Sequence, residues 1–414
     1  MHSPLSIVTI QENVDVRKPI RRWQGGWTHP RRVEMKNRCI VVVQYRPMED
    51  LPPVMTLLTL LKRMGENVFF VGVETPAGST FLQANDIEHE FLAPCKKGKI
   101  ARALSFFPRR RQLLVILKKL KVCYGNIVPW FQECHSAALA GDGVYRFGRP
   151  IVTFFEYECN YGENWIGFSL ERLFREGVIV ENERNRAEMT QKNHQLHDTP
   201  LVIANKAEVD FSKVPPLSAE AEKVFREIGT RPVFMYQGRY GKERKHAPFI
   251  LETIAKNRPD YCVLALPGED VVEKLLAPYP NAFTLPRIPA PGHLAVTARA
   301  TVGIATYYSE GDSPWALNAQ YCAPNKIYEY AAFGVPTLGN KIPGLESTIG
   351  EANAGILCDM TEEAVISAAD LLVRNIDQYR ANAKKFYDGT DVESQIKAVL
   401  ERTEMVVPWS ESCR

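Results

Sequence analysis

The chain has 414 residues, of which 45% are hydrophobic and 24% are charged, and its formal net charge is +3. This composition is typical of a folded protein, and so small a net charge does not by itself indicate nucleic acid as a partner. No apolar run approaches the roughly 18 residues of a membrane-spanning helix. The length predicts two domains, each large enough for its own core.

The N-terminus and the cysteines indicate where the protein works. Residues 1–36 are rich in Arg, Trp, Gly and Pro and lack the apolar core of a signal peptide, so we expect an irregular arm. Nine cysteines lie at irregular spacings without a C-x-x-C pair. Such a pattern favours reduced thiols and a cytoplasmic protein.

Strand and helix patterns alternate from residue 37 onwards. Short apolar runs predict buried parallel strands, and a helical repeat fills 51–64 between the first two of them. The predicted strands are 39–43, 68–73, 151–155, 177–180 and 201–203. Strand, helix and strand in this order form a right-handed unit of a doubly wound sheet. We therefore predict a first domain over 37–210.

The alternation restarts after a linker at 211–217, which contains Pro215 and Pro216. The second half has predicted strands at 233–236, 262–266, 282–285, 302–305, 337–338 and 355–357, and helices at 248–256, 271–276 and 293–298. Helices over 362–402 would complete a second domain at 218–402, followed by a tail at 403–414. The fold class is α/β, with two doubly wound Rossmann-like domains facing each other across a cleft.

The segment 324–349 carries the most chemical information. Lys326 and Glu329 lie three residues apart, so a helix places them on neighbouring positions near its N-terminus. Free backbone N–H groups there suit a phosphate, and a carboxylate one turn later can accept hydrogen bonds from sugar hydroxyls. This arrangement is typical of a nucleotide site.

The same segment contains the run NKIYEYAAFGVP from Asn325 to Pro336 and the turn Ile342-Pro343-Gly344. These residues resemble the donor-site signature of retaining glycosyltransferases with the GT-B fold, of the group 1 (family 4-like) type. The resemblance covers 230–400 well and 38–210 mainly in architecture. It implies transfer of a sugar from a UDP- or GDP-linked donor to an acceptor hydroxyl, with retention, and without a metal or a further cofactor.

The resemblance also implies roles for residues of the second half. Arg239 and Arg244 would stabilise the leaving diphosphate, with Lys242 and Lys245 as weaker candidates, and Arg287 would line the base pocket. The donor-binding residues would be Gly238, Arg287, Asn325, Lys326, Ile327 and Glu329. The alternative for the basic loop is an ordinary solvated surface.

Two positions depart from the family pattern. Tyr321 stands where the family has the first glutamate of its Glu-x7-Glu pair, and the acids of the loop 309–312 are candidate substitutes. Glu156 stands where the family has a histidine near the donor sugar. Glu156 and Glu158 share one side of an extended strand, so we expect them to face the acceptor and to act in catalysis. A structural ion pair is the alternative.

A basic segment occupies the first half. Between residues 96 and 121 the chain has ten Lys and Arg and no acid: Lys96, Lys97, Lys99, Arg102, Arg109, Arg110, Arg111, Lys118, Lys119 and Lys121. Apolar residues alternate with them, and such a helix pair is typical of a surface that binds an anionic membrane. The alternative is an ordinary helix whose Leu and Ile face packs on the sheet.

The expected partners are therefore a nucleotide-sugar donor, a saccharide or lipid-linked acceptor, and the inner face of a membrane, with a role in envelope or surface glycan synthesis. Nucleic acid is the weaker expectation, through a glycosyltransferase acting on DNA, and a small-molecule acceptor stays open. Two rivals are a non-catalytic partner or sensor protein with this fold and a sugar-nucleotide epimerase.

Overall fold

The computed structural model describes residues 38–94, 99–156, 167–240, 246–308 and 314–404, without the side chains of 99–104 and 314–315. Residues 36–414 form one compact unit. The predicted arm at 1–36 lies outside the described residues.

The first sheet has seven parallel strands in the order β3-β2-β1-β4-β5-β6-β7. The order reverses between β1 and β4, as in doubly wound sheets. The strands are β1 (Cys39–Gln44), β2 (Asn67–Gly72), β3 (Glu88–Phe91), β4 (Ile127–Gln132), β5 (Ile151–Phe154), β6 (Val178–Glu181) and β7 (Leu201–Val202).

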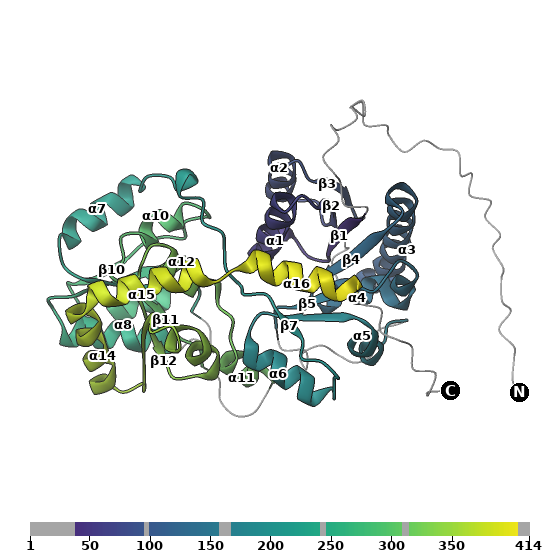
Figure 1. Ribbon diagram of the computed structural model, residues 1–414. Helices are drawn as coiled ribbons and strands as arrows, with labels where there is room; N and C mark the ends of the chain where they lie inside the picture. The colour runs from purple at the N-terminus through teal and green to yellow at the C-terminus, as the bar shows by residue number, and fades with distance from the viewer. Residues whose placement is uncertain (1–37, 95–98, 157–166, 241–245, 309–313, 405–414) are drawn as a thin grey trace, which may run out of the picture. The chain divides into compact units, whose positions relative to one another are not determined.

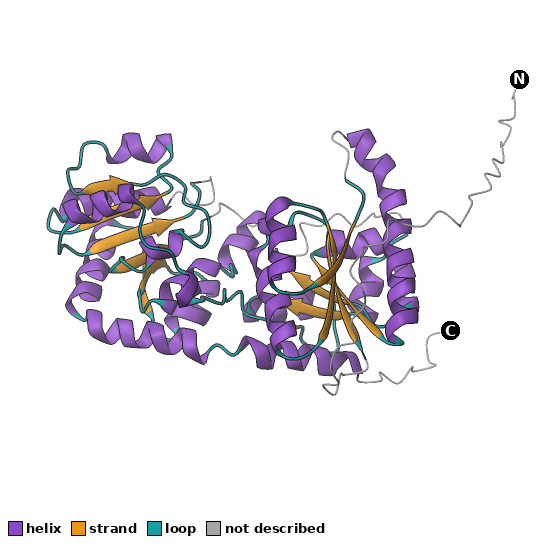
Figure 2. Ribbon diagram, turned by 90° about the horizontal axis from the view of Figure 1, so that it is seen from above, coloured by secondary structure: helices purple, strands orange, loops and turns teal. Residues whose placement is uncertain are grey.

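Helices cover both faces of this sheet (Figure 2). They are α1 (Pro52–Arg63), α2 (Pro76–Ala84), α3 (Lys99–Tyr124), α4 (Cys134–Ala140), α5 (Leu170–Glu176) and α6 (Arg184–Asn193), with short 3-10 turns at Met48–Asp50 and Gly141–Arg146. The helix α1 begins with two prolines, whose fixed φ suits the first helical turn. The predicted α/β architecture of the first half is confirmed.

The second sheet has six parallel strands in the order β10-β9-β8-β11-β12-β13. The strands are β8 (Val233–Gln237), β9 (Cys262–Leu266), β10 (Ala282–Thr284), β11 (Val302–Ala305), β12 (Thr337–Asn340) and β13 (Gly355–Cys358). The helices are α7 (Ala219–Ile228), α8 (His246–Asn257), α9 (Asp270–Leu276), α10 (His293–Thr297), α11 (Pro314–Gln320), α12 (Asn325–Ala332), α13 (Pro343–Leu345), α14 (Glu362–Arg374) and α15 (Ile376–Gly389).

The last helix, α16 (Val392–Glu404), returns to the first sheet (Figure 1). Its apolar side chains Val392, Ile396, Val399 and Leu400 belong to the core formed by β1, β4 and α1. The sequence had assigned these residues to the second domain. A helical repeat shows which residues are buried but not which sheet buries them.

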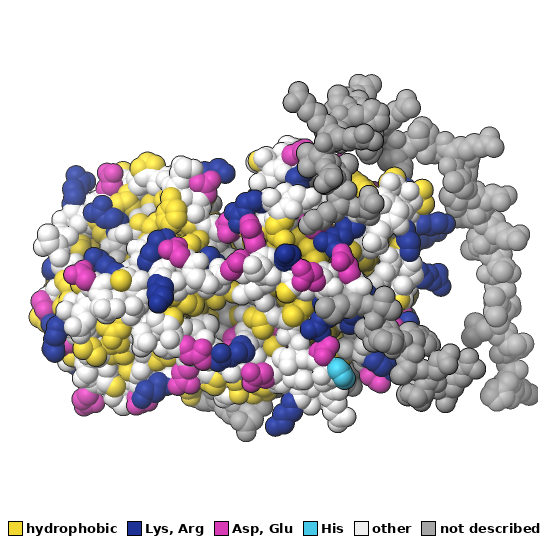
Figure 3. Space-filling model, in the orientation of Figure 1, with side chains coloured by type: hydrophobic (Ala, Val, Ile, Leu, Met, Phe, Trp, Pro, Cys, Tyr) yellow, Lys and Arg dark blue, Asp and Glu magenta, His cyan; other side chains and the backbone are white. Residues whose placement is uncertain are grey.

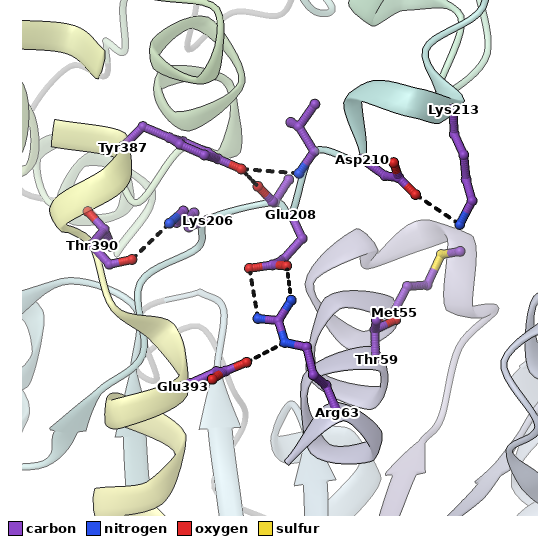
Figure 4. A network of polar contacts seen from close by, with 12 residues as sticks. Met55, Thr59, Arg63, Lys206, Glu208, Asp210, Lys213, Tyr387, Thr390 and Glu393 are labelled. Atoms are coloured by element: carbon purple, nitrogen blue, oxygen red, sulfur yellow. Dashed lines mark hydrogen bonds and ion pairs between the residues drawn. The ribbon is translucent and has the colours of Figure 1, made fainter. Parts of the chain in front are cut away.

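A polar network joins the segment after β7 to α1, α15 and α16 (Figure 4). The Tyr387 hydroxyl donates to the carbonyl oxygen of Ala207 at 3.1 Å and accepts from the amide nitrogen of Val209 at 3.1 Å. The Arg63 guanidinium pairs with Glu208 at 2.7 Å and with Glu393. The chain passes between the two sheets after β7 and again between α15 and α16, and this network connects the two crossings.

The basic segment forms one long helix, α3, instead of the predicted pair, and Pro108 lies inside it. Leu113, Ile116, Leu117 and Leu120 pack into the first core. Ser105 and Arg109 are buried at the same helical spacing, so within the described side chains one buried stripe passes Pro108 without a break. Lys96 and Lys97 lie outside the described residues.

Candidate functional site

A cleft of about 1560 Å³ lies at the carboxyl ends of both sheets. One wall comes from the first half, through Asp50, Phe155, Glu156, Arg186 and Asn205. The other wall includes Gln237, Gly238, Arg239, Glu269, Arg287, His293, Tyr307, Asn325, Lys326 and Glu329. Ligands of doubly wound folds bind at this edge, because the strands end there and the loops that follow them converge.

The Glu329 carboxylate is held on one side and open on the other. Its Oε2 accepts a hydrogen bond from Nε2 of Gln237 and lies 3.5 Å from Nε2 of His293. Within the described part of the chain, Oε1 has no hydrogen-bond partner, and the residue lines the cleft. Glu329 lies one turn into α12.

Gln237, the last residue of β8, makes two more contacts besides its hydrogen bond to Glu329. Its backbone N–H donates to the Tyr330 hydroxyl at 3.1 Å, and its Oε1 accepts from the Thr297 hydroxyl at 2.8 Å. Complete burial raises the pKa of Tyr330 well above its usual value, so this phenol stays neutral. No pattern in the sequence had indicated Gln237, Thr297 or His293 as site residues.

The Lys326 ammonium lies against aromatic rings at the start of α12. Its Nζ is 4.3 Å from the centroid of the Tyr236 ring and 5.7 Å from that of Tyr307. The side chain is only 8% exposed and still lines the cleft. A cation kept from water interacts more strongly with an anion than a solvated one does.

Three other predicted residues line the same wall. Gly238 follows β8 at φ +142°, where a side chain is strained, and its N–H donates to the carbonyl oxygen of Leu266 at 2.8 Å. Arg239 and Arg287 are exposed side chains of the cleft. Arg244 lies outside the described residues, as do Lys242 and Lys245.

The turn Ile342-Pro343-Gly344 supports the loop that precedes α12. A Cβ on Gly344 would lie 2.5 Å from the carbonyl oxygen of Cys322, so only glycine allows this approach. Cys322 and Ala323 line the cleft, whereas Tyr321 does not. The Ile327 side chain is 1% exposed, packs in the core behind α12 and does not line the cleft.

The first wall carries opposite charges. Glu156 is exposed at the end of β5 and lines the cleft together with Asp50. The Arg186 guanidinium is buried and lies 3.1 Å from Glu181, and it also donates to the carbonyl oxygen of Phe155 at 3.0 Å. Glu158 lies outside the described residues.

Behind this wall lies the buried residue Glu133, which no sequence pattern had indicated as a site residue. It follows β4 with φ +66°, which strains a residue that has a side chain. Burial raises the pKa of its carboxyl, the Arg46 guanidinium 3.5 Å away opposes the shift, and Glu156 and Asp50 add to it. Strained backbone conformations are common at functional sites, so Glu133 is a candidate functional residue.

Replacing Glu133 by glutamine is expected to make stability less dependent on pH. Since the folded state holds the carboxyl proton more tightly, this residue contributes stability that is present below the unfolded pKa near 4.5 and is lost as pH rises through the higher folded value. Glu133→Gln cannot ionise, so its free energy of unfolding should exceed that of the wild type by about 1 kcal/mol at pH 7 and match it at pH 4. Urea unfolding at both pH values measures the difference, and an equal offset at both would contradict the assignment.

The described residues contain no group of three or more His, Cys, Asp or Glu side chains placed to hold a metal ion. In that same part of the chain, no helix combines the length and the apolar character needed to cross a bilayer.

Comparison with known proteins rests on solved structures. No protein-family model matches the chain, and no curated protein sequence is similar to it. A glycosyltransferase from Rickettsia africae superposes with a TM-score of 0.64 at 14% identity, over 88% of this chain and 97% of its own. Anabaena HepE in complex with UDP and glucose gives a TM-score of 0.65 at 11% identity, covering 88% and 98%.

A third similar structure is the UDP-GlcNAc 2-epimerase of Neisseria meningitidis bound to UDP-GlcNAc, with a TM-score of 0.59 at 12% identity over 88% and 100% of the two chains. Both sheets are therefore shared with these proteins along almost their whole length. The chain has the GT-B fold. The predicted fold class is confirmed, and at these identities the likeness extends to the fold alone.

Proposed function

We propose that this protein is a glycosyltransferase that moves a sugar from a nucleoside diphosphate sugar to an acceptor hydroxyl. The observation that carries the proposal is the second wall of the cleft. There a carboxylate with one open oxygen, Glu329, lies one turn from the buried cation of Lys326, at the carboxyl edge of the sheet. Carboxylate and cation at this spacing suit the ribose and the diphosphate of one nucleotide.

Each wall then has its own task. When the bond between the sugar and the diphosphate breaks, the electron pair leaves with the phosphate oxygen, and Lys326, Arg239 and Arg244 stabilise the charge that develops there. The acceptor oxygen forms the new bond to the anomeric carbon, on the face that the diphosphate leaves. Its proton goes to the leaving phosphate or to a carboxylate of the first wall, with Glu156 and Glu158 as the candidates. The reaction proceeds with retention and needs no metal.

Calorimetric titration with UDP, GDP, ADP and their sugar conjugates in the presence of EDTA tests the donor site. We expect one nucleotide to bind with a Kd in the micromolar range. Turnover of the matching sugar conjugate, followed as release of the free diphosphate, tests the activity. The absence of binding for every nucleotide would contradict the proposal.

Glu156→Ala is expected to lower turnover by about 10- to 100-fold while the Kd of the nucleotide changes by less than twofold. The reason is that general acid–base groups contribute to the chemical step, and Glu156 lies on the wall opposite Glu329. Kinetics of diphosphate release and calorimetry on the same preparation give the two values. An equal loss of affinity would show that both walls bind the donor.

We propose that the exposed face of α3 binds the membrane in which a lipid-linked acceptor lies. The exposed α3 residues Phe107, Arg111, Val115, Lys118 and Val122 follow helical spacing along the outside of the first half. Lys and Arg side chains gather over α3 in Figure 3. Each such cation near an anionic leaflet contributes about 1 kcal/mol. A lipid-linked acceptor in the synthesis of a surface glycan, on the cytoplasmic side, fits this surface.

Charge reversal tests this surface. The triple variant Arg111→Glu, Lys118→Glu, Lys119→Glu should lower sedimentation with phosphatidylserine vesicles by about tenfold or more. A matched triple reversal at Lys223, Lys274 and Lys385, exposed on the second half, serves as the control. Equal effects of the two triples would contradict a docking surface on α3, and salt-sensitive binding to duplex DNA alone would favour the nucleic-acid alternative.

An epimerase is the second candidate. Two observations favour it: sugar-nucleotide 2-epimerases are among the similar structures, and Tyr321 stands where the glycosyltransferase pattern has a carboxylate. Incubation of the bound sugar nucleotide without any acceptor separates the candidates. An epimerase converts the sugar and keeps it on the nucleotide, whereas a transferase releases the diphosphate.

A further inference from the structure

Gln237 and His293 contact the held oxygen of Glu329, and Thr297 contacts Gln237. We refer to these three residues together as the Glu329 clamp. Gln237 comes from the end of β8, whereas Thr297 and His293 lie one turn apart on α10. Thr297 is fully buried and does not line the cleft, so it can affect a ligand only through its neighbours.

The Glu329 carboxylate, which can only accept hydrogen bonds, fixes which way the Gln237 amide points. The Thr297 hydroxyl binds the other end of that amide and also lies 3.1 Å from the carbonyl oxygen of His293. It donates to Oε1 of Gln237 at 2.8 Å, and Nε2 of that amide donates to Oε2 of Glu329. The opposite orientation would bring the amide oxygen against the carboxylate, where two acceptors repel each other. The hydroxyl, the amide and the carboxylate therefore form one directed chain.

The clamp leaves the Glu329 carboxylate with one oxygen for a ligand. Each carboxylate oxygen has about two acceptor positions. Gln237 and His293 occupy the Oε2 side, so Oε1 offers both of its positions to the cleft. Two positions on one oxygen match two neighbouring hydroxyls, as on a ribose.

We propose that Gln237 and Thr297 are positioning residues that make the site select ribonucleotides over deoxyribonucleotides, which deepens the proposed donor site and rests on it. With the clamp in place, the two ribose hydroxyls of a nucleoside diphosphate occupy both acceptor positions of Oε1. A nucleotide that lacks the 2′-hydroxyl or the 3′-hydroxyl leaves one acceptor position empty. Without the clamp the carboxylate turns, and the difference between the two sugars becomes smaller.

The test is the ratio of dissociation constants for 2′-deoxy-UDP and UDP, measured by calorimetry on the full chain, with 3′-deoxy-UDP as a second probe and GDP analogues if GDP is the nucleotide that binds. We expect the wild type to prefer UDP by about tenfold or more, as for the loss of one hydrogen bond to a charged group. Thr297→Val, which keeps the shape and removes the hydroxyl, should bring the ratio at least threefold closer to one. Partial unfolding lowers both affinities equally, so the ratio does not depend on the folded fraction.

Thr253→Val is the matched control, because Thr253 is a buried threonine of α8 outside the cleft. Its ratio should equal that of the wild type. A second variant, Gln237→Met, should change the ratio as much as Thr297→Val does, and the double variant no further, because Thr297 acts through Gln237.

The outcomes separate the two proposals. A wild-type preference that survives in both Thr297→Val and Gln237→Met would overturn the positioning role while the donor site stands. A wild type that binds UDP and 2′-deoxy-UDP equally would overturn it as well. If no nucleoside diphosphate binds the wild type, the proposed function fails and this inference fails with it.

Discussion

Glu329→Ala is expected to weaken the binding of UDP by about 10- to 100-fold. A hydrogen bond to a charged group contributes about 1.5–3 kcal/mol. Oε1 of this carboxylate is the open acceptor on the second wall of the cleft. Two ribose hydroxyls donate to this oxygen in the proposed complex, so the loss should fall in the upper part of this range. Calorimetry with UDP in EDTA measures the change.

The specificity of this effect depends on the control. Glu363→Ala removes an exposed carboxylate from the first turn of α14 and has the same change in net charge. Its Kd for UDP should stay within twofold of the wild type. If both variants bind UDP as the wild type does, Glu329 does not contact the nucleotide. If Glu329→Ala weakens UMP as much as UDP, the contact is to the nucleoside, as the proposal requires.

Most of the fold follows from short patterns in the sequence. Buried parallel strands are continuous apolar runs, so β1 and β9 are visible without any structure. Two strands were missed for different reasons. β3 is an edge strand of sequence EHEF, without the apolar run of a buried strand. β4 contains Pro129, and proline inside a run argues against a strand.

The position of Pro129 explains why β4 tolerates it. β4 pairs with β1 along its whole length, but its pairing with β5 begins only at Trp130. Pro129 therefore lies just before the first residue of β4 that pairs with β5. Whether a strand accepts a proline depends on its register with the neighbouring strands, and no local sequence pattern reveals that register. For this reason β4, the central strand of the first sheet, was not predicted.

Some residues of the candidate site could be predicted from the sequence and others could not. Lys326 and Glu329 could be predicted because a helix brings residues three apart onto one face. Gln237, Thr297 and His293 could not, because they lie on separate elements that meet only after the second sheet has formed. Ile327 lies inside the same motif with its side chain in the core, so its predicted contact with the donor stays a prediction.

Lys326→Met is expected to lower the turnover of the sugar nucleotide by about 100- to 1000-fold, while the Kd of the intact donor rises by less than tenfold. The reason is that negative charge grows on the diphosphate as the glycosidic bond breaks, so a preorganised cation stabilises the transition state more than the bound donor. Here Nζ is nearly buried against the rings of Tyr236 and Tyr307, where water screens it little. Methionine keeps the length of the side chain and removes the charge.

Release of UDP from the bound sugar nucleotide and calorimetry with the same donor give the two quantities. Lys256→Met, which removes an exposed lysine of α8 paired with Glu362 at 3.2 Å, is the control and should leave both unchanged. Equal losses of affinity and turnover in Lys326→Met would mean that the ammonium holds the donor without favouring its cleavage. A turnover loss that far exceeds the loss of affinity would identify Lys326 as the cation that the leaving diphosphate requires.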